Sequence, residues 1–400
     1  MDSVILELSH SIKRVDTHPL QRVLYSQDLL KIPKFLERFV KHPICVVQPE
    51  SDEEVRAVLK ISRKYGIPVV PRGAATSAYG GAVTIKPCIV VDFTRMRKIE
   101  IAGKKAVVES GAVWLDVEKE LNRHGLALRV YPSSAPAGTV GGWIAQGGYG
   151  IGSLKYGGIG KNIEWLEVAD FDGIKKVGGD ELKNYVGLFG TTGLILRACL
   201  KLRDNVRIDS VAIKTDFAKS IDLLDGAYHG VFVNRELAKM LGFNEADLLL
   251  LSYEGEAEKE GDKELGSRMW ENRFNLFRAG REREVVFTEA ILPYETAPDF
   301  LSTVDIPVEA VFTKDNVVFL GFIPVGNYYR AALKAIKFIK IAEKFGGRTY
   351  ATGMLFPHKG LADYAGSYKK AIDPDSLLNP GKAVEGNSFS RMIKLAEMIV

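Results

Sequence analysis

Cysteine is scarce in this chain of 400 residues, which contains only three. Cys45, Cys88 and Cys199 lie far apart and form no CxxC pair, so the sequence offers no zinc site, iron–sulfur cluster or disulfide framework. Sparing use of cysteine is typical of proteins from a reducing compartment. We therefore predict a cytoplasmic protein without a bound metal.

Long apolar runs and a strong excess of charge are also missing. No stretch reaches the roughly 18 consecutive apolar residues of a membrane span, and the N-terminal MDSVILELSHSIKR lacks the apolar core of a signal peptide. Lys and Arg number 54 against 50 Asp and Glu, which gives a net charge of +4 without a basic stripe. We expect no transmembrane segment and no nucleic-acid partner.

The best-known phosphate-binding motifs are absent from the one loop that could hold a phosphate. Residues 72–81, RGAATSAYGG, follow a predicted strand but contain neither GxxxxGK[ST] nor GxGxxG. The loop is nevertheless rich in small residues and has hydroxyls at Thr76 and Ser77, and backbone N–H groups in such a loop can converge on phosphate oxygens. An ordinary turn between two strands is the alternative interpretation.

Glycine, in contrast, is concentrated in one segment. Residues 131–160, YPSSAPAGTVGGWIAQGGYGIGSLKYGGIG, contain ten glycines, together with Trp143, Ile144, Leu154 and three tyrosines. A disordered linker would lack these large apolar residues. Glycines beside bulky side chains indicate a backbone pressed against a flat or anionic ligand. We predict that this segment wraps a large cofactor.

The remaining pattern indicates mixed α and β structure. Ser51 and Glu54 have the spacing of a capping box, and they predict a helix that ends at Gly66. Short β-branched runs on both sides of this helix suggest an α/β unit. Residues 206–350 then alternate predicted strands and helices, which favours a separate α+β domain.

Five segments in register resemble the FAD-binding domain of the vanillyl-alcohol oxidase/p-cresol methylhydroxylase superfamily. The resemblance is closest to D-lactate dehydrogenases and the glycolate oxidase flavin subunit. It covers most of residues 20–205 and the last thirty. It is carried by residues 42–83, 109–126 (ESGAVWLDVEKELNRHGL), 131–148 (YPSSAPAGTVGGWIAQGG), 155–168 (KYGGIGKNIEWLEV) and 188–195 (LFGTTGLI), and by Ile372 to Pro374 with Leu377 to Lys382 near the end.

This resemblance implies an α+β fold with a two-subdomain FAD-binding domain of the p-cresol methylhydroxylase type and an α+β substrate (cap) domain. The implied division is 1–205 for the FAD-binding domain, 206–350 for the cap domain and 351–400 for a C-terminal segment that returns to the FAD domain. Relatives that attach FAD covalently do so from a histidine at the position of Thr76. The resemblance therefore implies non-covalent FAD.

The resemblance also implies roles for particular residues along the cofactor. Those for the pyrophosphate are Arg72, Gly73, Ala74, Ala75, Thr76 and Ser77. Those for the ribityl chain and the isoalloxazine ring are Pro132, Ser133, Ser134, Gly138, Thr139, Gly141 and Gly142, continued along the flavin by Ala145, Gln146 and Gly148. Gly193 and Ile195 are expected near the adenine or the pyrimidine side, and Asn379 is expected to reach back from the C-terminal segment.

The cap domain departs from the family's pattern at its polar motifs. The family's GHxGDGNxH aligns with 321–329, where Phe322 and Tyr329 replace the histidines, and TGEHG aligns with 352–356 without its acid and histidine. Phenylalanine and methionine cannot ligate a hard metal or take a proton. A metal-assisted reaction is therefore not expected. The predicted pocket is apolar and aromatic, and its residues are Phe322, Tyr328, Tyr329, Met354, Leu355 and Phe356.

The resemblance implies oxidation of a 2-hydroxy acid or a similar alcohol by hydride transfer to the flavin. Arg273 and Arg278 are candidates to bind a carboxylate, and His358 or a tyrosine such as Tyr329 is a candidate to take the proton. Solvated surface positions are the alternative for Arg273 and His358. A second reading is an altered flavin subunit that relays electrons in a glycolate-oxidase-like complex with an iron–sulfur or other acceptor subunit. A third, a binding module that lost its flavin, conflicts with the intact glycine segment.

Overall fold

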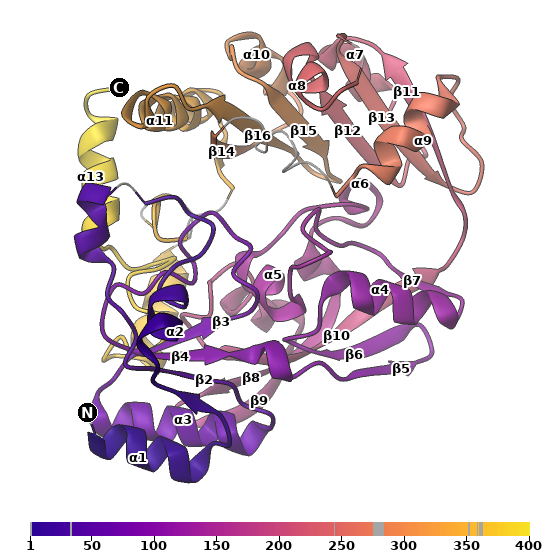
Figure 1. Cartoon of the computed structure of the whole chain (residues 1–400). Helices are drawn as coiled ribbons and strands as arrows, with labels where there is room; N and C mark the ends of the chain where they lie inside the picture. The colour runs from indigo at the N-terminus through magenta and orange to yellow at the C-terminus, as the bar shows by residue number, and fades with distance from the viewer. Residues whose placement is uncertain are drawn as a thin grey trace.

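Three β-sheets organise the chain (Figure 1). The computed structural model describes residues 2–32, 34–243, 245–274, 284–350, 353–357, 359 and 363–400. The first two sheets lie together in the lower half of the view in Figure 1, and the third lies above them. Among the described helices, none has the length and apolarity needed to cross a membrane.

The first sheet is small and mostly parallel. It contains, in spatial order, β1 (Val15–Asp16), β2 (Cys45–Val47), β4 (Ile89–Asp92) and β3 (Val69–Arg72), with the β2–β4 and β3–β4 pairs parallel. Around it lie α1 (Asp2–Ser11), α2 (Pro19–Leu24), η1 (Lys34–Phe39), α3 (Asp52–Tyr65) and η2 (Phe93–Arg95). The predicted start of α3 is confirmed, because the Ser51 hydroxyl accepts a hydrogen bond from the Glu54 N–H at 3.3 Å. Its predicted end is confirmed too, since Gly66 has φ 63°.

The second sheet is antiparallel and carries the glycine-rich segment on its surface. Its order is β5 (Ile99–Ala102), β6 (Lys105–Glu109), β10 (Leu194–Asp204), β8 (Ile163–Asp170) and β9 (Gly173–Gly178), and β7 (Leu126–Leu128) also pairs with β10. The associated helices are α4 (Trp114–Arg123), α5 (Val140–Gln146), α6 (Ser153–Tyr156), η3 (Ile159–Asn162) and η4 (Gly179–Asn184). Trp143 on α5 packs edge-on against Trp114 on α4, with ring centroids 5.2 Å apart. The glycine-rich segment is therefore part of a core and not a linker.

The third sheet is antiparallel and has helices on both faces. Its order is β11 (Ile208–Lys214), β13 (Leu248–Glu254), β12 (His229–Val233), β15 (Val308–Phe312), β16 (Val317–Pro324), β14 (Val285–Leu292) and β17 (Arg348–Thr349). One core contains side chains of α7 (Phe217–Asp222), α10 (Ala297–Ser302) and α11 (Tyr328–Lys344), and the core on the other face contains those of α8 (Arg235–Met240) and α9 (Lys263–Glu271). Successive strand side chains point to opposite faces, so each strand contributes to both cores. The domain boundaries at 205 and 350 stay a prediction.

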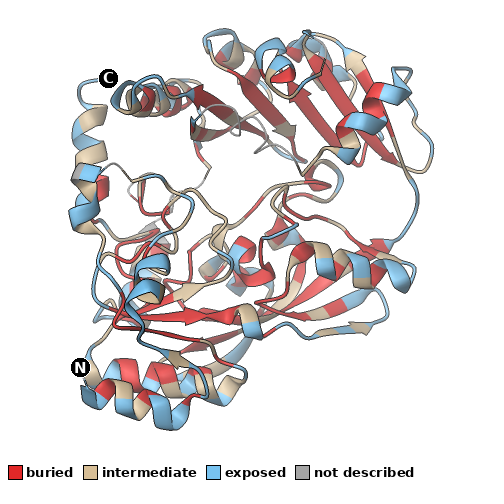
Figure 2. Cartoon of the chain, viewed as in Figure 1, coloured by how far each residue is buried: buried red, intermediate tan, exposed pale blue. Residues whose placement is uncertain are grey.

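The end of the chain returns to the first sheet. It contains α12 (Asp363–Ile372) and α13 (Ser388–Glu397). Between these helices, the Val69 N–H of β3 donates to the Leu377 carbonyl at 2.7 Å, and the Asn379 N–H donates to the Val69 carbonyl at 2.8 Å. Figure 2 shows that buried residues follow the strands of all three sheets, with the exposed residues mainly on helices and loops.

Candidate active site

A channel lies between two loops of the lower half of the molecule. One loop, residues 72–77, begins at the carboxyl end of the parallel strand β3, where open α/β sheets commonly bind ligands. The other, residues 138–142, leads into α5. The two approach so closely that a Cβ atom on Gly73 would lie 2.0 Å from Thr139 Oγ1. The second loop is also packed against the residue after β6, since a Cβ on Gly141 would lie 2.4 Å from Ser110 Cβ. Only glycine allows this approach.

Most of the residues predicted to bind a cofactor line this channel. They are Arg72, Gly73, Ala74, Ala75, Thr76, Ser77, Ser134, Gly138, Thr139, Gly141, Gly142, Ala145, Gln146 and Ile195. Pro132 and Ser133 line the adjoining cavity described below. The channel lining also contains residues that were not predicted, among them Asp28, Ser110, Phe189 and Gly190.

Three predicted cofactor residues lie outside the channel lining. Gly148 is packed beneath the Trp143 ring, because a Cβ there would lie 2.0 Å from two indole atoms. Gly193 precedes β10 next to Tyr185. Asn379 is buried, and its Nδ2 donates to the carbonyls of Gly81 at 3.0 Å and Phe189 at 2.7 Å. These residues pack behind the walls of the channel, and their predicted contact with the cofactor stays a prediction.

Several buried polar groups at the channel have no partner in the described structure. Ser110 Oγ, Thr139 Oγ1 and Lys382 Nζ belong to this set. Burial lowers the pKa of Lys382 to about 8 and raises that of the lining residue Asp28 to about 6. A buried polar group without a hydrogen bond costs about 1–3 kcal/mol. Unsatisfied hydroxyls and an ammonium group therefore fit a long ligand that carries acceptor oxygens, such as a pyrophosphate and a polyol chain.

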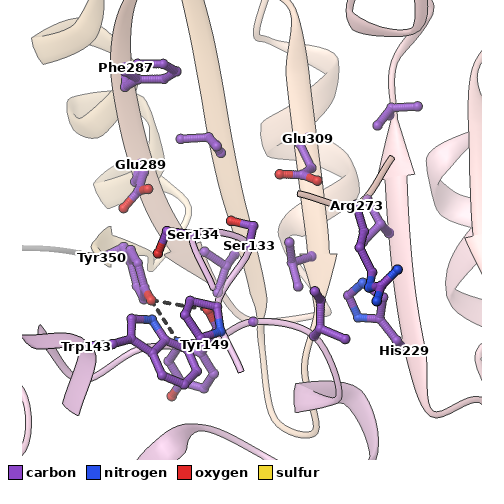
Figure 3. Close-up of a pocket in the computed structure, with 18 of the residues that line it drawn as sticks. Ser133, Ser134, Trp143, Tyr149, His229, Arg273, Phe287, Glu289, Glu309 and Tyr350 are labelled. Atoms are coloured by element: carbon purple, nitrogen blue, oxygen red, sulfur yellow. Dashed lines mark hydrogen bonds between the residues drawn. The ribbon is translucent and has the colours of Figure 1, made fainter. Parts of the chain in front are cut away.

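A second cavity, of about 180 Å³, adjoins the channel. Thr76, Ser77, Ser134, Trp143 and Gln146 line both spaces. On its opposite side the cavity is bounded by one face of the third sheet (Figure 3). The alternation of strand side chains accounts for the residues of this face, which are His229, Val231, Val233, Leu250, Phe287, Glu289, Glu309, Val311, Val318 and Leu320.

A cation lies beside a neutral histidine at one end of this cavity (Figure 3). The Arg273 guanidinium lies 4.3 Å from the Trp270 ring centroid, and its Nη1 donates to the Trp270 carbonyl at 2.8 Å. Its side chain also hydrogen-bonds Tyr131, the first residue of the glycine-rich segment. Arg273 Nε and His229 Nδ1 are buried and have no hydrogen-bond partner in the part of the chain that the structure describes. Burial, together with Arg273, lowers the pKa of His229 to about 3, so its imidazole is neutral at pH 7.

Two carboxyl groups lie farther along the same sheet face. Glu289 on β14 and Glu309 on β15 both pair with Leu320 of the intervening strand β16, so the three form one row. Glu309 is buried, and Glu289 Oε2 is shielded without a hydrogen-bond partner. Burial raises the pKa of Glu289 to about 8 against a smaller opposing effect of its hydrogen bond with Tyr79. Burial and the neighbouring Glu289 raise the pKa of Glu309 to about 8 as well.

Tyrosines connect the cofactor side of the cavity to this sheet. Tyr79 follows the 72–77 loop directly and hydrogen-bonds Glu289. The Tyr350 hydroxyl, just after β17, accepts a hydrogen bond from the Tyr149 N–H at 2.7 Å. Burial raises the pKa values of both Tyr79 and Tyr350, so both hydroxyls stay protonated and can donate hydrogen bonds.

The predicted catalytic residues lie in different parts of the molecule or outside the described residues. Arg273 lines the cavity. His358 and Arg278 lie outside the described residues. Tyr329 is 63% exposed in the first turn of α11 and does not line the cavity, so the structure does not bring it together with Arg273. The physical reason is that Asn327 caps this helix and its first turn projects into solvent.

The residues of the predicted apolar and aromatic pocket lie outside this cavity. None of Phe322, Tyr328, Tyr329, Met354, Leu355 and Phe356 lines the cavity. Phe322 instead packs on Phe287, with ring centroids 5.4 Å apart. The polar groups that do line it, His229, Glu289, Glu309 and Tyr350, were missed. The sequence did contain a signal for the two glutamates. Each is the one carboxylate inside an apolar strand, VVFTEAIL or VEAVF, and a carboxylate in such a strand is unusual without a partner.

Comparisons with known proteins support a cofactor site in the channel. Residues 43–178 match the family model described as FAD binding domain. The chain is 34% identical to the D-lactate dehydrogenase of Archaeoglobus fulgidus over 44% of this chain and 42% of that enzyme. It is 24% identical to the glycolate oxidase subunit GlcD of Escherichia coli over 87% of this chain and 85% of that protein. Its fold matches p-cresol methylhydroxylase with a TM-score of 0.73 and 15% identity, covering 96% of this chain and 97% of that one.

The FAD binding domain and the channel define the class of this protein: it is a flavoprotein, and its cofactor is FAD. The predicted α+β fold of the p-cresol methylhydroxylase type is confirmed. Residues 43–178 thus carry an FAD binding domain, and the chain as a whole has the fold of p-cresol methylhydroxylase.

Proposed function

We propose that this chain oxidises the alcohol carbon of a 2-hydroxy acid in the cavity next to the FAD channel. The observation that carries the proposal is the Arg273 guanidinium, which lines a cavity that shares five wall residues with the channel. Similarity to proteins named D-lactate dehydrogenase and glycolate oxidase subunit supports this substrate class. FAD is held without a covalent bond, because Thr76 stands where covalent relatives have a histidine.

Arg273 binds the substrate carboxylate. A guanidinium is planar and can form two parallel hydrogen bonds with a carboxylate. The rings of Trp270 and Phe274, 4.3 and 4.4 Å from the guanidinium carbon, fix its plane. Among the described residues its Nε has no hydrogen-bond partner, which leaves this donor for the substrate. A lysine here would supply charge without this orientation.

His229 takes the proton of the substrate hydroxyl. Its Nδ1 is next to the carboxylate position and has no hydrogen-bond partner among the residues that the structure describes. In the free protein Arg273 contributes to the low pKa of His229. A bound carboxylate offsets that positive charge, so substrate binding raises the pKa of the imidazole toward its ordinary value and makes it a better base.

The cavity walls and the cofactor complete the reaction. When bound, FAD supplies the two-electron acceptor for the hydride that leaves the alcohol carbon. The apolar side chains of Val231, Leu250 and Val311 exclude water around the reacting carbon. The hydroxyl proton goes to His229, and the product is a 2-oxo acid.

The electron acceptor that follows FAD is proposed to be a partner subunit. The similar Escherichia coli protein is named a subunit, and the three cysteines of this chain are buried and separate, so they provide no cluster of their own. The purified chain is then expected to reduce its flavin rapidly with substrate but to return the electrons slowly to oxygen. Fast reoxidation by oxygen alone would make this protein a self-sufficient oxidase.

The proposed reaction is tested by an anaerobic screen of the purified yellow protein. Candidate 2-hydroxy acids, aldoses and aromatic alcohols are added without metal, and loss of the flavin absorbance band is followed. The proposal predicts bleaching by a 2-hydroxy acid and none by aldoses or aromatic alcohols. Bleaching by aromatic alcohols alone would contradict it.

A further inference from the structure

We infer that Glu289 and Glu309 form a second binding subsite, which selects 2-hydroxy acids whose tail ends in an uncharged hydrogen-bonding group such as a hydroxyl. This inference rests on the proposed function and deepens it. It concerns the end of the cavity that is far from Arg273. There the third sheet contributes the carboxyl groups of Glu289 and Glu309 to the cavity lining.

The distance between the two ends of the cavity is the first argument. His229 and Val233 are four residues apart on β12, and Val233 pairs with Glu309 of β15. At a rise of about 3.3 Å per residue, the two backbone positions are roughly 13 Å apart. In a three-carbon hydroxy acid, two C–C bonds of about 1.5 Å separate the ends of the carbon chain. A small acid bound at Arg273 therefore leaves the glutamates without contact, whereas a longer one reaches them.

The second argument is the wall between the ends. The sheet residues between the His229 position and the glutamate row are apolar, and they are Val231, Leu250, Val311 and Val318, with Leu320 between the two glutamates. Such a wall suits methylene groups. The cavity thus has a cationic end, an apolar middle and a hydrogen-bonding end, and a substrate with the same order of groups fits it.

The third argument is the chemistry of the two carboxyl groups. Among the described residues that line the cavity, Arg273 is the only Lys or Arg, and it lies at the other end. Glu289 Oε2 is shielded from solvent and lacks a partner, while Tyr79 hydrogen-bonds this carboxyl group. Two buried carboxyl groups without a cation favour their protonated forms. A carboxylic acid both donates and accepts hydrogen bonds, which matches a hydroxyl, whereas a second substrate carboxylate would be buried without a counter-charge.

The test compares four acids that share one carbon skeleton, using the wild-type protein with its FAD. They are 2-hydroxyhexanoate, 2,6-dihydroxyhexanoate, 2-hydroxyadipate and 6-amino-2-hydroxyhexanoate. Binding is measured from the perturbation of the flavin spectrum under anaerobic conditions, and turnover from its bleaching. We expect the 2,6-dihydroxy acid to bind at least about tenfold more tightly than the alkyl acid, with the dicarboxylate weakest.

Two variants separate the hydrogen bond from the shape of the subsite. Glu309→Gln keeps a donor and an acceptor of nearly the same size, so the preference for the hydroxyl tail is expected to persist. Glu309→Leu removes them, and the preference is expected to disappear while the alkyl acid binds as well as or better than before. A bound flavin with an unchanged spectrum shows that each variant is folded.

The outcomes distinguish this subsite from the reaction itself. Bleaching by all the acids at similar affinity would keep the proposed reaction and overturn the subsite. Graded binding without any bleaching would keep the subsite and overturn the reaction. Tightest binding of the amino-tailed acid would show that the glutamates are ionised and bind a cation, and it would overturn the inference, as would the absence of any binding.

Discussion

Arg273 lines the cavity, its guanidinium lies beside the rings of Trp270 and Phe274, and its buried Nε has no hydrogen-bond partner among the described residues. If it binds the substrate carboxylate, Arg273→Met lowers kcat/KM by about 10²-fold or more, because a charge-assisted bidentate contact is lost. Arg273→Lys is expected to retain more kcat/KM than Arg273→Met but less than the wild type. Steady-state kinetics with the best 2-hydroxy acid provides the measurement.

A matched control for this change exists on α9, the helix that ends two residues before Arg273. Arg268 also stacks on an aromatic ring, that of Phe243 at 5.5 Å, but it does not line the cavity. Arg268→Met is expected to leave kcat/KM within about twofold of wild type. Equal losses in the two variants would mean that Arg273 acts on stability and not on the substrate.

His229 is expected to move a proton and not only to fill space. His229→Gln keeps hydrogen-bonding capacity but cannot accept a proton, so kcat falls by about 10²-fold or more while KM changes little. A large rise in KM with an unchanged kcat would reassign His229 to binding. Stopped-flow bleaching of the flavin under anaerobic conditions measures the affected step directly.

Glu289 and Glu309 also link stability to pH. Both have pKa values raised to about 8 in the folded protein, from an ordinary value of 4.5. Between these values the folded chain binds more protons than the unfolded chain, so the free energy of unfolding falls as pH rises from about 5 to 8. Thermal melting at several pH values checks this.

The double variant Glu289→Gln/Glu309→Gln is the comparison for this prediction. Amides do not titrate, so the decline of melting temperature with pH is expected to be shallower than in wild type. Parallel curves for the two proteins would contradict protonation of these carboxyl groups in the folded state.

Sequence reasoning reached some residues of the site and missed others for physical reasons. Arg72 to Ser77 were predictable because local backbone geometry requires small residues in a row. Glu289 and Glu309 meet only through the pairing of β14 and β15 with β16, which involves long-range contacts that no local pattern encodes. The exposed position of Tyr329 was not predicted, because alignment with a family motif does not show which way a helix turn faces.

At the scale of elements, the loops around α5 are the most constrained part of the molecule. Gly141 in α5 contacts Ser110, at the end of β6, and a Cβ there would lie 2.4 Å from Ser110 Cβ. Gly141→Ala is therefore expected to push α5 away from the sheet and weaken FAD binding by about tenfold or more. Fluorescence titration of the protein with FAD, after removal of the bound cofactor, measures this.

Another glycine in the same segment supplies the control. A Cβ on Gly160 would meet only Val186, at an ordinary distance of 3.6 Å. Gly160→Ala is expected to bind FAD as wild type does. Equal weakening in both variants would show that the segment needs glycine for flexibility in general and not for one close approach.

Local signals predicted the elements that end in well-defined caps. Ser51 and Gly66 delimit α3 as expected, because each satisfies backbone groups by a local hydrogen bond or a left-handed turn. The small N-terminal elements α2 and η1 were not predicted individually, since they are short. The strand order of the three sheets could not be predicted from the sequence, because it depends on pairing between distant segments.

At the scale of the whole molecule, the cofactor connects parts that are distant in sequence. The channel is lined by Asp28, by the loops after β3 and before α5, and by Ile195 on β10. A ligand that binds only the folded state stabilises it in proportion to the logarithm of its concentration over Kd. We therefore expect removal of FAD to lower the melting temperature, and added FAD to restore it.

Acid precipitation of the protein extends this prediction to the attachment of the cofactor. Since Thr76 stands where covalent relatives have the histidine that attaches the flavin, all of the yellow colour is expected to stay in the supernatant. Colour that remains in the washed pellet would indicate a covalent bond elsewhere in the chain.

We propose above that Arg273 binds a 2-hydroxy acid in the cavity between the third sheet and the FAD channel. The most direct test is the anaerobic rate of flavin bleaching by a 2-hydroxy acid, measured side by side for wild type and Arg273→Met with equal FAD content. We expect the wild-type flavin to bleach, and we expect the bleaching rate of Arg273→Met to be lower by about 10²-fold or more. Equal rates in the two proteins, or a wild-type flavin that no 2-hydroxy acid bleaches, would contradict it.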